Sequence, residues 1–270
     1  MTAPSTGPMS TRGSGHRGDG GLYDLRSMTE SKSSRTVVRS GSAKSSAASD
    51  EVTVSRSDDS VQSGATRQHR TRRDRKDIRD LLIAAAMVEF GTRGYEGAST
   101  RSIAERANAH QPQINYHFAN KFELWKATVE RLFELLETAM VGLDEIKDPG
   151  DHFAEWIRRL VDFAAENPAL NQIIVQESSS RNERTEWLVE NYIRPRFAER
   201  RRAWRRLRAA GIAAPLDENL VHYVVIGAVT LPFVNSAEAT MLFGGRPDTP
   251  RLVRRHADGL VRTLLPGLGH

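Results

Sequence analysis

The strongest constraint in this sequence is the spacing of its apolar residues from Asp77 to the end of the chain. Apolar residues recur there every three or four positions, which is the period of an amphipathic α-helix. Runs of alternating β-branched residues flanked by hairpin turns, the usual pattern of strands, are missing from that region. The sequence therefore predicts an all-α fold.

Turn and capping residues divide this region into separate helices. The first helix is expected to begin at Asp77 and to end near Gly91 and Gly94. Asn120 is a favourable N-cap for a helix that continues to about Val141. The remaining helices are expected at 100–107, 111–117, 151–166, 169–179, 183–210, 217–242 and 250–265, with kinks at Pro195 and Pro232.

The N-terminal part of the chain has a different composition. Residues 1–66 are rich in Ser, Thr, Gly, Arg and Asp and lack apolar periodicity, so they are predicted to be disordered. A basic run at residues 67–76 (RQHRTRRDRK) leads into the first periodic segment. A solvated linker and a contact with phosphates or with the minor groove of DNA are both open interpretations of this run.

Charge and composition exclude some classes of protein. The formal net charge of +5 suits a polyanionic partner. The chain has no cysteine, which excludes disulfides, thiolate catalysis and Cys-ligated zinc. No secretory signal is found at the N-terminus, and the longest apolar run, Val224–Val234, is too short to span a bilayer. A cytoplasmic protein is therefore expected, with no membrane partner.

A helix-turn-helix is predicted between Ser99 and Phe118 (STRSIAERANAHQPQINYHF). Ala104 supplies the small side chain needed where two helices approach closely, and Asn108 tolerates the positive φ of a tight turn. Ile114 is placed to pack the second helix against the first, so that its other face can enter the major groove. Taken alone, the same pattern also fits two ordinary core helices.

Two segments carry a resemblance to a known family. Residues 114–124 (INYHFANKFEL) resemble the signature of the TetR family of bacterial transcriptional regulators, and residues 82–95 look like the first helix and turn of the same domain. The chain departs from that family at Asn108, where glycine is usual, and at Asn115, where a second aromatic residue is frequent. The resemblance implies an N-terminal three-helix DNA-binding domain at residues 71–123, after a tail at 1–70, and a helical bundle for ligand binding and dimerisation at 124–270.

The resemblance also assigns roles within the domain. Gln111, Gln113 and Asn115 are the expected base readers, because Gln and Asn side chains can pair bidentately with adenine. Pro112 can contact a thymine methyl group. The expected phosphate contacts, which position the domain without reading sequence, are Thr100, Arg101, Tyr116, His117 and Lys121. His110, at the start of the same helix, is expected to meet bases or phosphates. Phe118 is interpreted as a core residue.

For the C-terminal region the sequence predicts less. The resemblance implies a ligand cavity among the central helices, and aromatic or polar residues within apolar helices are its candidates. They are Trp156, Phe163, Gln176, Glu177, Trp187, Asn191, Phe233 and Asn235. The basic stretch at residues 194–208 is interpreted as an amphipathic helix with Phe197, Trp204 and Leu207 inward and its arginines outward, with nucleic-acid binding as the alternative.

The last two helices are expected to form the dimer interface that the resemblance implies. One apolar face comprises Val221, Val224, Val225, Ala228 and Val229, with the small Gly227 allowing close approach. The other comprises Leu252, Val253, Leu260, Val261, Leu264 and Leu265.

The expected function is that of a sequence-specific DNA-binding regulator. The hypothesis is a homodimeric repressor that a small hydrophobic or amphipathic ligand releases from a near-palindromic operator. The alternative is a regulator or adaptor whose C-terminal region only dimerises or docks a protein partner. No catalytic set of residues is found, so an enzyme is not expected, and no cofactor or metal is predicted.

Overall fold

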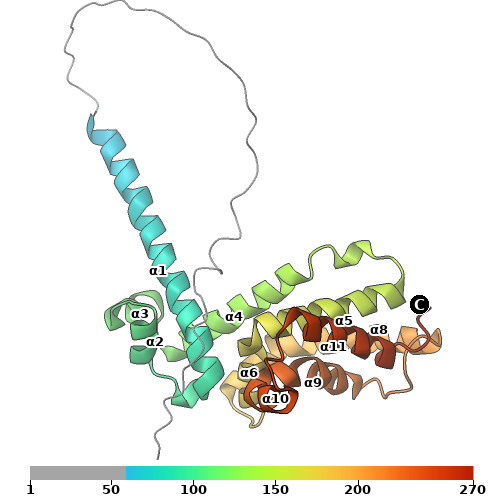
Figure 1. Ribbon diagram of the computed structural model, residues 1–270. Coiled ribbons are helices and arrows are strands. Elements are labelled where there is room, and N and C mark those ends of the chain that lie inside the picture. Colours follow the sequence, from blue (N-terminus) through green and yellow to red (C-terminus); the bar gives the residue numbers. More distant parts are fainter. Residues whose placement is uncertain (1–58, 270) are drawn as a thin grey trace, which may run out of the picture. The chain divides into compact units, whose positions relative to one another are not determined.

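The computed structural model describes residues 59–269, and residues 59–76 by their backbone alone. Every regular element in that range is a helix, as the apolar spacing predicts (Figure 1). Most of the tail predicted at residues 1–70 lies outside the described residues. The described residues, 59–269, lie in one compact unit of the chain.

The first helix, α1, is longer than the sequence predicts. It extends over Asp59–Gly97, whereas apolar periodicity placed its start at Asp77. Residues 59–76 are mostly polar, so they lack the periodic apolar face by which the sequence indicates a helix. Gly91 lies within the helix, and the non-helical kink occurs at Gly94, where φ is 69° and ψ is 175°.

Three further helices complete the N-terminal part of the compact unit. They are α2 (Thr100–Arg106), α3 (Gln111–His117) and α4 (Lys121–Ala139), with bounds close to those predicted. Ser99 Oγ accepts the N–H of Ser102 at 3.0 Å, and Asn120 Oδ1 accepts the N–H of Glu123 at 2.9 Å. These caps satisfy backbone donors at the first turns of α2 and α4 and so fix where each helix begins. Residues 77–121 are called the reading head below.

The core of the reading head continues into the rest of the protein. Large side chains from all four helices are at most 5% exposed; they include Leu82, Phe90, Ile103, Ile114, Phe118, Leu124 and Trp125. Phe163, Leu170, Ile173 and Leu188 from the following helices belong to the same cluster. Since each fully buried side chain of this size contributes about 1.5–3 kcal/mol, this shared core holds the reading head against the neighbouring helices.

The C-terminal bundle (residues 143–265) is built around α5 (Pro149–Glu166). Around it lie the helices α6 (Pro168–Glu177), α8 (Arg194–Ala209), α9 (Val221–Val234) and α11 (Pro250–Leu264). The shorter elements are η1 (Leu143–Glu145), α7 (Glu183–Leu188), a π-helical turn η2 (Val189–Ile193) and α10 (Ser236–Phe243). A second core cluster fills the bundle, with Ile157, Val161, Trp204, Val225 and Val229 almost fully buried.

Two predicted helices are divided, near the prolines where the sequence predicts a kink. The predicted helix 183–210 is divided into α7, the π-helical turn and α8, and Pro195 lies at the start of α8. The predicted helix 217–242 is divided at Asn235 into α9 and α10, which are bent by 76°. Pro232, near the end of α9, lacks the N–H that a continuous helix uses and disfavours its continuation. Pro149 begins α5, where its missing N–H is harmless, so this helix starts two residues before the predicted 151.

Within residues 59–269 no single helix is both long enough and apolar enough to cross a membrane. The bent pair α9 and α10 reaches that length and composition only when the two helices are taken together.

Candidate nucleic-acid interface

The turn between α2 and α3 has the backbone that the helix-turn-helix requires. Asn108 has φ of 51° and is the one non-glycine residue with positive φ in the described part of the chain. The N–H of Asn108 bonds to Glu105 O at 3.1 Å, and that of Ala109 bonds to Ala104 O at 2.9 Å. The chain therefore leaves α2 abruptly and enters α3 at a sharp angle, as predicted from Asn108.

The two helices of the motif are locked by small and apolar residues. Ala104 is 2% exposed and Ile114 is 1% exposed, and both belong to the core of the reading head. Because a seven-residue helix is not stable alone, α3 depends on this packing for its shape. Phe118, at the end of α3, is also buried, and the Arg79 guanidinium lies 5.4 Å from the centre of its ring.

A buried carboxylate that the sequence did not single out connects α1 to α2. Glu89 is 1% exposed, and its Oε1 accepts the hydroxyl of Ser102 at 2.6 Å. Arg93 and Arg106 lie 3.2 and 3.7 Å from its two oxygens. The charge of Glu89 is thus fully partnered, and it fixes α2 on α1. A glutamate on the expected apolar face of a helix is the signal that could have indicated it.

The outward face of α3 presents polar side chains. Gln111, Pro112, Asn115 and Tyr116 are exposed, and Tyr116 is 65% exposed. Gln113 differs, since it is half-buried and its Oε1 accepts the N–H of His110 at 2.7 Å. Of the three expected base readers, Gln111 and Asn115 therefore point outward, whereas Gln113 already caps the start of α3.

The expected phosphate contacts surround this face. Thr100 begins α2, and Arg101 is exposed with its Nε 2.9 Å from Glu105 Oε1. His110 is exposed at the N-cap of α3, and His117 is half-buried at its end. Lys121 begins α4, where its Nζ lies 4.5 Å from the centre of the Tyr95 ring.

Tyr95 links the reading head to the C-terminal bundle. Besides Lys121, the guanidinium of Arg184 lies 4.0 Å from the ring centre of Tyr95. Arg184 also pairs with Glu96 of α1 at 3.1 Å and with the buried Glu177 at 2.8 Å. Burial raises the pKa of the Tyr95 hydroxyl, and the charge of Arg184 partly opposes that rise. Arg184 was not predicted, because its role depends on contacts between segments far apart in the sequence.

A second link involves α6, which packs along α1. Gln176 Nε2 donates to Gly91 O at 2.7 Å. A side chain added at Gly94 would meet Gln176 Oε1 at 2.5 Å, and Gly94 has a positive φ, so glycine is required at this position. The end of α1 is therefore attached to the bundle through both α6 and α7.

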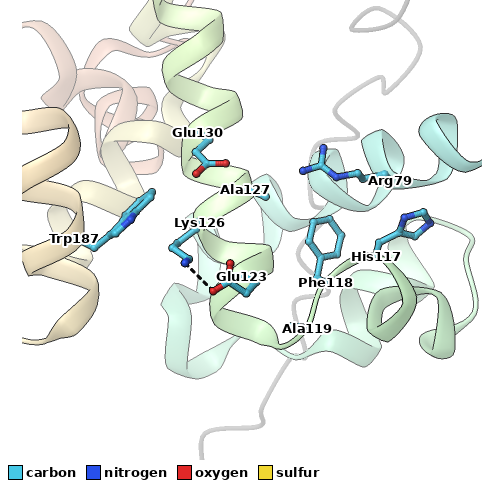
Figure 2. A pocket seen from close by; sticks show the side chains of 9 residues that line it. All are labelled: Arg79, His117, Phe118, Ala119, Glu123, Lys126, Ala127, Glu130 and Trp187. Carbon is cyan, nitrogen blue, oxygen red and sulfur yellow. Dashed lines mark ion pairs between the residues drawn. The ribbon is translucent and has the colours of Figure 1, made fainter.

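A cavity of about 390 Å³ opens beside the start of α4 (Figure 2). Lys126 and Glu123 form an ion pair of 2.7 Å at its edge, and Trp187 faces α4. Its lining consists of Arg79, His117, Phe118, Ala119, Glu123, Lys126, Ala127, Glu130 and Trp187. Of the eight residues that the sequence suggested for a ligand, Trp187 alone lines this cavity.

The other seven ligand candidates do not gather at one place. Phe163 belongs to the core shared with the reading head, Gln176 bonds to Gly91 of α1, and Glu177 pairs with Arg184. Trp156 and Phe233 lie in the core of the C-terminal bundle or against it. Asn191 and Asn235 are exposed, with side chains that bond to their own helical segments.

The predicted dimer faces need correction. Val221, Val225 and Val229 of α9 are at most 1% exposed, and Val253 and Val261 of α11 are buried as well. These residues form the bundle's own core. The apolar residues of α9 that face outward are Leu220, Tyr223, Val224 and Leu231, and those of α10 are Met241, Leu242 and Phe243. Beside them, a side chain added at Gly227 would meet nothing within 4 Å.

Comparison with known proteins agrees with this geometry. Residues 82–128, which contain the helix-turn-helix, match the model of the bacterial regulatory proteins of the tetR family. In this segment the chain resembles the DNA-binding domain of the TetR family. The chain is 30% identical over 106 residues to the HTH-type transcriptional repressor SCO4008 of Streptomyces coelicolor, an alignment that covers 39% of this chain and 52% of that protein. It is 38% identical over 68 residues to the HTH-type transcriptional activator FasR of Mycolicibacterium smegmatis, covering 25% of this chain and 30% of that protein.

Solved structures show that the likeness in fold extends beyond the reading head. AibR in complex with isovaleryl coenzyme A and operator DNA has a TM-score of 0.58 at 19% identity, covering 70% of this chain and 98% of that one. HlyIIR, a hemolysin II transcriptional regulator, has a TM-score of 0.53 at 18% identity, covering 69% and 98%. The chain spans about half the length of the Streptomyces relative and about a third of FasR.

Proposed function

We propose that this protein is a sequence-specific DNA-binding repressor that acts as a homodimer and responds to a small-molecule effector. The observation that carries the proposal is the locked helix-turn-helix. Asn108 shapes the turn, Ala104 and Ile114 hold the two helices together, and α3 is left with an exposed polar face. Packing of this kind presents a helix to the major groove of DNA. The curated relatives matched by this chain are transcriptional regulators, and no catalytic reaction is proposed.

Within this proposal, Gln111 and Asn115 read bases. Both are exposed, and both side chains carry the donor and acceptor pair that adenine presents in the major groove. Pro112 contributes an apolar contact in the first turn of α3. Gln113 caps α3 and so stabilises the helix that carries the readers, because its oxygen is already bonded to the His110 N–H.

Phosphate contacts position the readers. The reading face is flanked by six candidate residues. They are Thr100 and Arg101 at the start of α2, His110 and His117 at the two ends of α3, and Tyr116 and Lys121. These residues contribute affinity that falls with salt and carry no sequence preference of their own. The Lys121 ammonium lies over the ring of Tyr95, so its side chain would have to move to contact a phosphate.

The dimer is proposed to form through the exposed apolar residues of α9 and α10. Tyr223 is 71% exposed, Leu231 56% and Met241 85%, and such a cluster in water is typical of an interface. Gly227 leaves room for a second helix to approach closely. A two-fold axis through this surface would give two reading heads and would match a near-palindromic operator.

The effector response is proposed to use the contacts at the end of α1. A ligand that binds the C-terminal bundle and shifts α6 or α7 would change the hydrogen bond from Gln176 to Gly91 and the contact of Arg184 with the Tyr95 ring. The reading head would then turn relative to the reading head of the second copy, provided the ligand binds the two states with different affinity. The second candidate, dimerisation or partner docking without an effector, would leave these contacts unchanged by any small molecule.

Two measurements test the proposal. Titration of a labelled fragment of the protein's own promoter region should show tight binding that weakens steeply with salt, and absence of salt-sensitive binding would contradict the DNA-binding role. Sedimentation should give a dimer for the native chain and a monomer for Leu231→Arg, with Arg262→Glu on α11 as an exposed control. A native monomer, or a Leu231→Arg dimer, would contradict the proposed interface.

A further inference from the structure

The feature that the proposed function leaves unexplained is Arg200, in the middle of α8. Its guanidinium carbon lies 5.5 Å from the centre of the Trp156 ring on α5. Its Nη2 lies 2.9 Å from Nδ1 of His222 on α9. The residue is half-buried, and its Nε is a buried donor with no hydrogen-bond partner. The pattern of this helix predicts that its arginines point outward, and Arg200 does not.

Its neighbours on the same helix are paired with carboxylates. Arg196 Nη2 lies 2.7 Å from Glu137, and Arg201 Nη2 lies 2.7 Å from Glu218. Arg205 Nε donates to the same Glu218 at 2.6 Å. Arg200 forms no ion pair with any described residue, and its one side-chain hydrogen bond is to His222. The helix therefore matches its other inward-reaching arginines to acids but leaves this one unmatched.

His222 cannot balance the charge of Arg200. Burial and the charge of Arg200 lower the pKa of His222 to about 4, so its ring is neutral near pH 7. Its Nδ1 therefore accepts from the guanidinium, which has only donors. Burial and the nearby charge of Arg196 lower the pKa of Arg200 to about 10, opposed by Glu199, and Arg200 stays protonated at neutral pH.

The surroundings of Arg200 combine this positive charge with aromatic walls. Trp156 lies on one side, and Phe197 lies edge-on to His222 with ring centres 5.5 Å apart. Trp156, Phe197 and His222 are half-buried, like Arg200, so the place where α5, α8 and α9 meet is reached from solvent. A charge that is partly removed from water and has no carboxylate at ion-pairing distance lowers stability, and an anion from solution would reduce that penalty.

We propose that Arg200 anchors a binding site for the carboxylate of a small organic acid, whose apolar part lies against Trp156 and Phe197. This inference rests on the proposed effector response and names the chemical class of the effector. One unpaired guanidinium matches the single charge of a carboxylate. A phosphate dianion would need a second free cation, and Arg196 and Arg201 are already paired. One of the five N–H groups of the guanidinium is engaged with His222, and those that remain suit the two oxygens of a carboxylate.

The test compares the full chain with Arg200→Gln. Arg202→Gln is the matched control, because Arg202 lies on the same helix but is exposed. Thermal unfolding is followed with acetate, hexanoate and phenylacetate, with the neutral phenylacetamide, and with inorganic phosphate. Hexanoate or phenylacetate should raise the unfolding temperature of the native chain and of Arg202→Gln in a saturable way. Arg200→Gln should show no such rise, and phenylacetamide should stabilise none of the three proteins.

A merely structural role for Arg200 gives a different result. Without any anion, Arg200→Gln should unfold at the same temperature as the native chain or higher, because it removes an unpaired charge. A lower unfolding temperature that carboxylates leave unchanged would overturn the proposal. So would equal stabilisation of native and Arg200→Gln chains, stabilisation by phosphate alone, or no response of the native chain to the three carboxylates.

The proposed function is checked separately on the same samples. Arg200→Gln without ligand should bind promoter DNA and sediment as the native chain does. Loss of DNA binding in every sample with the carboxylate response intact would refute the regulator and leave the site standing. Intact DNA binding without a carboxylate response would refute the site alone. A change of mass in Arg200→Gln would mean that a carboxylate of a second copy fills the position, which also overturns the proposal.

Discussion

The reading head and the C-terminal bundle differ in whether a charge removed from water has an oppositely charged partner. In the reading head, Glu89 is almost fully buried and is met by Ser102, Arg93 and Arg106. In the C-terminal bundle, Arg200 lies among aromatic rings with only a neutral histidine beside it. A surface that docks on DNA needs a scaffold that is complete before binding, because the readers must be held in place. A site for a small ligand can leave one interaction for the ligand to complete.

The largest expected effect is the loss of the lock within the reading head. Ile114→Ala should lower the free energy of unfolding by about 2–5 kcal/mol, because it opens a cavity at a side chain that is 1% exposed. Urea denaturation measures the loss, and DNA affinity should fall with it because Ile114 is the buried residue within α3. Val175→Ala, at a position 59% exposed on α6, is the control and should change stability by less than about 0.5 kcal/mol. A small effect of Ile114→Ala would mean that α3 is not held by this residue.

The next effect concerns the link between the two regions. Arg184→Ala should lower stability by about 2–3 kcal/mol, because Glu177, 5% exposed, would be left buried without its partner. Glu177→Gln in the same chain should recover part of the loss, and the double-mutant cycle measures the coupling. Arg181→Ala is the control, because its side chain is 89% exposed and pairs only at the surface. Equal losses of stability for Arg181→Ala and Arg184→Ala would show that Arg184 does not stabilise the link between the two regions.

The two glutamines of α3 are expected to have different roles, Gln111 in base recognition and Gln113 in stabilising the helix. Gln111→Ala should leave unfolding unchanged and weaken discrimination at one base pair by about 1–3 kcal/mol, because the side chain is exposed and unengaged in folding. Gln113→Ala should lower stability by about 1 kcal/mol through loss of the bond to the His110 N–H, with little change in base preference. Selection of bound sequences from a random pool, together with urea denaturation, measures both. The reverse pattern would exchange the two roles.

A smaller effect depends on pH. The folded chain lowers the pKa of His222 to about 4, below its ordinary value near 6.5, so unfolding takes up a proton between these values. Stability should therefore fall as the pH is lowered from about 6.5 towards 4, by about 1 kcal/mol once solvent screening of a half-exposed ring is allowed for. His222→Gln should remove this part of the pH dependence. An identical pH profile in both chains would show that the native ring is not held neutral.

The sequence predicted the reading head far better than the C-terminal bundle. Asn108, Ala104 and Ile114 were assigned correctly because their roles depend on neighbours within twenty residues, where helical spacing determines who meets whom. The roles of Arg184, Glu177 and Arg200 depend on helices far apart in the chain, and no local pattern indicates such contacts. The apolar faces of α9 and α11 were detected but assigned to the wrong side. Periodicity shows that a face is apolar, and only the packed structure shows whether the protein's own core or a partner covers it.

The smallest expected effect is at the turn itself. Asn108 has φ of 51°, which costs asparagine less than other side chains and costs glycine nothing. Asn108→Gly should therefore change the free energy of unfolding by less than about 1 kcal/mol, since relief of backbone strain is offset by the greater freedom of glycine in the unfolded chain. Asn108→Ala is the matched comparison and should be destabilised by about 1–2 kcal/mol, because alanine gains nothing in this conformation. DNA affinity of Asn108→Gly should equal that of the native chain, because the exposed side chain supports the turn and is not among the proposed readers. If Asn108→Gly folded normally but lost its preferred operator, Asn108 would belong to the reading surface, and the division between scaffold and readers within the reading head would have to be redrawn.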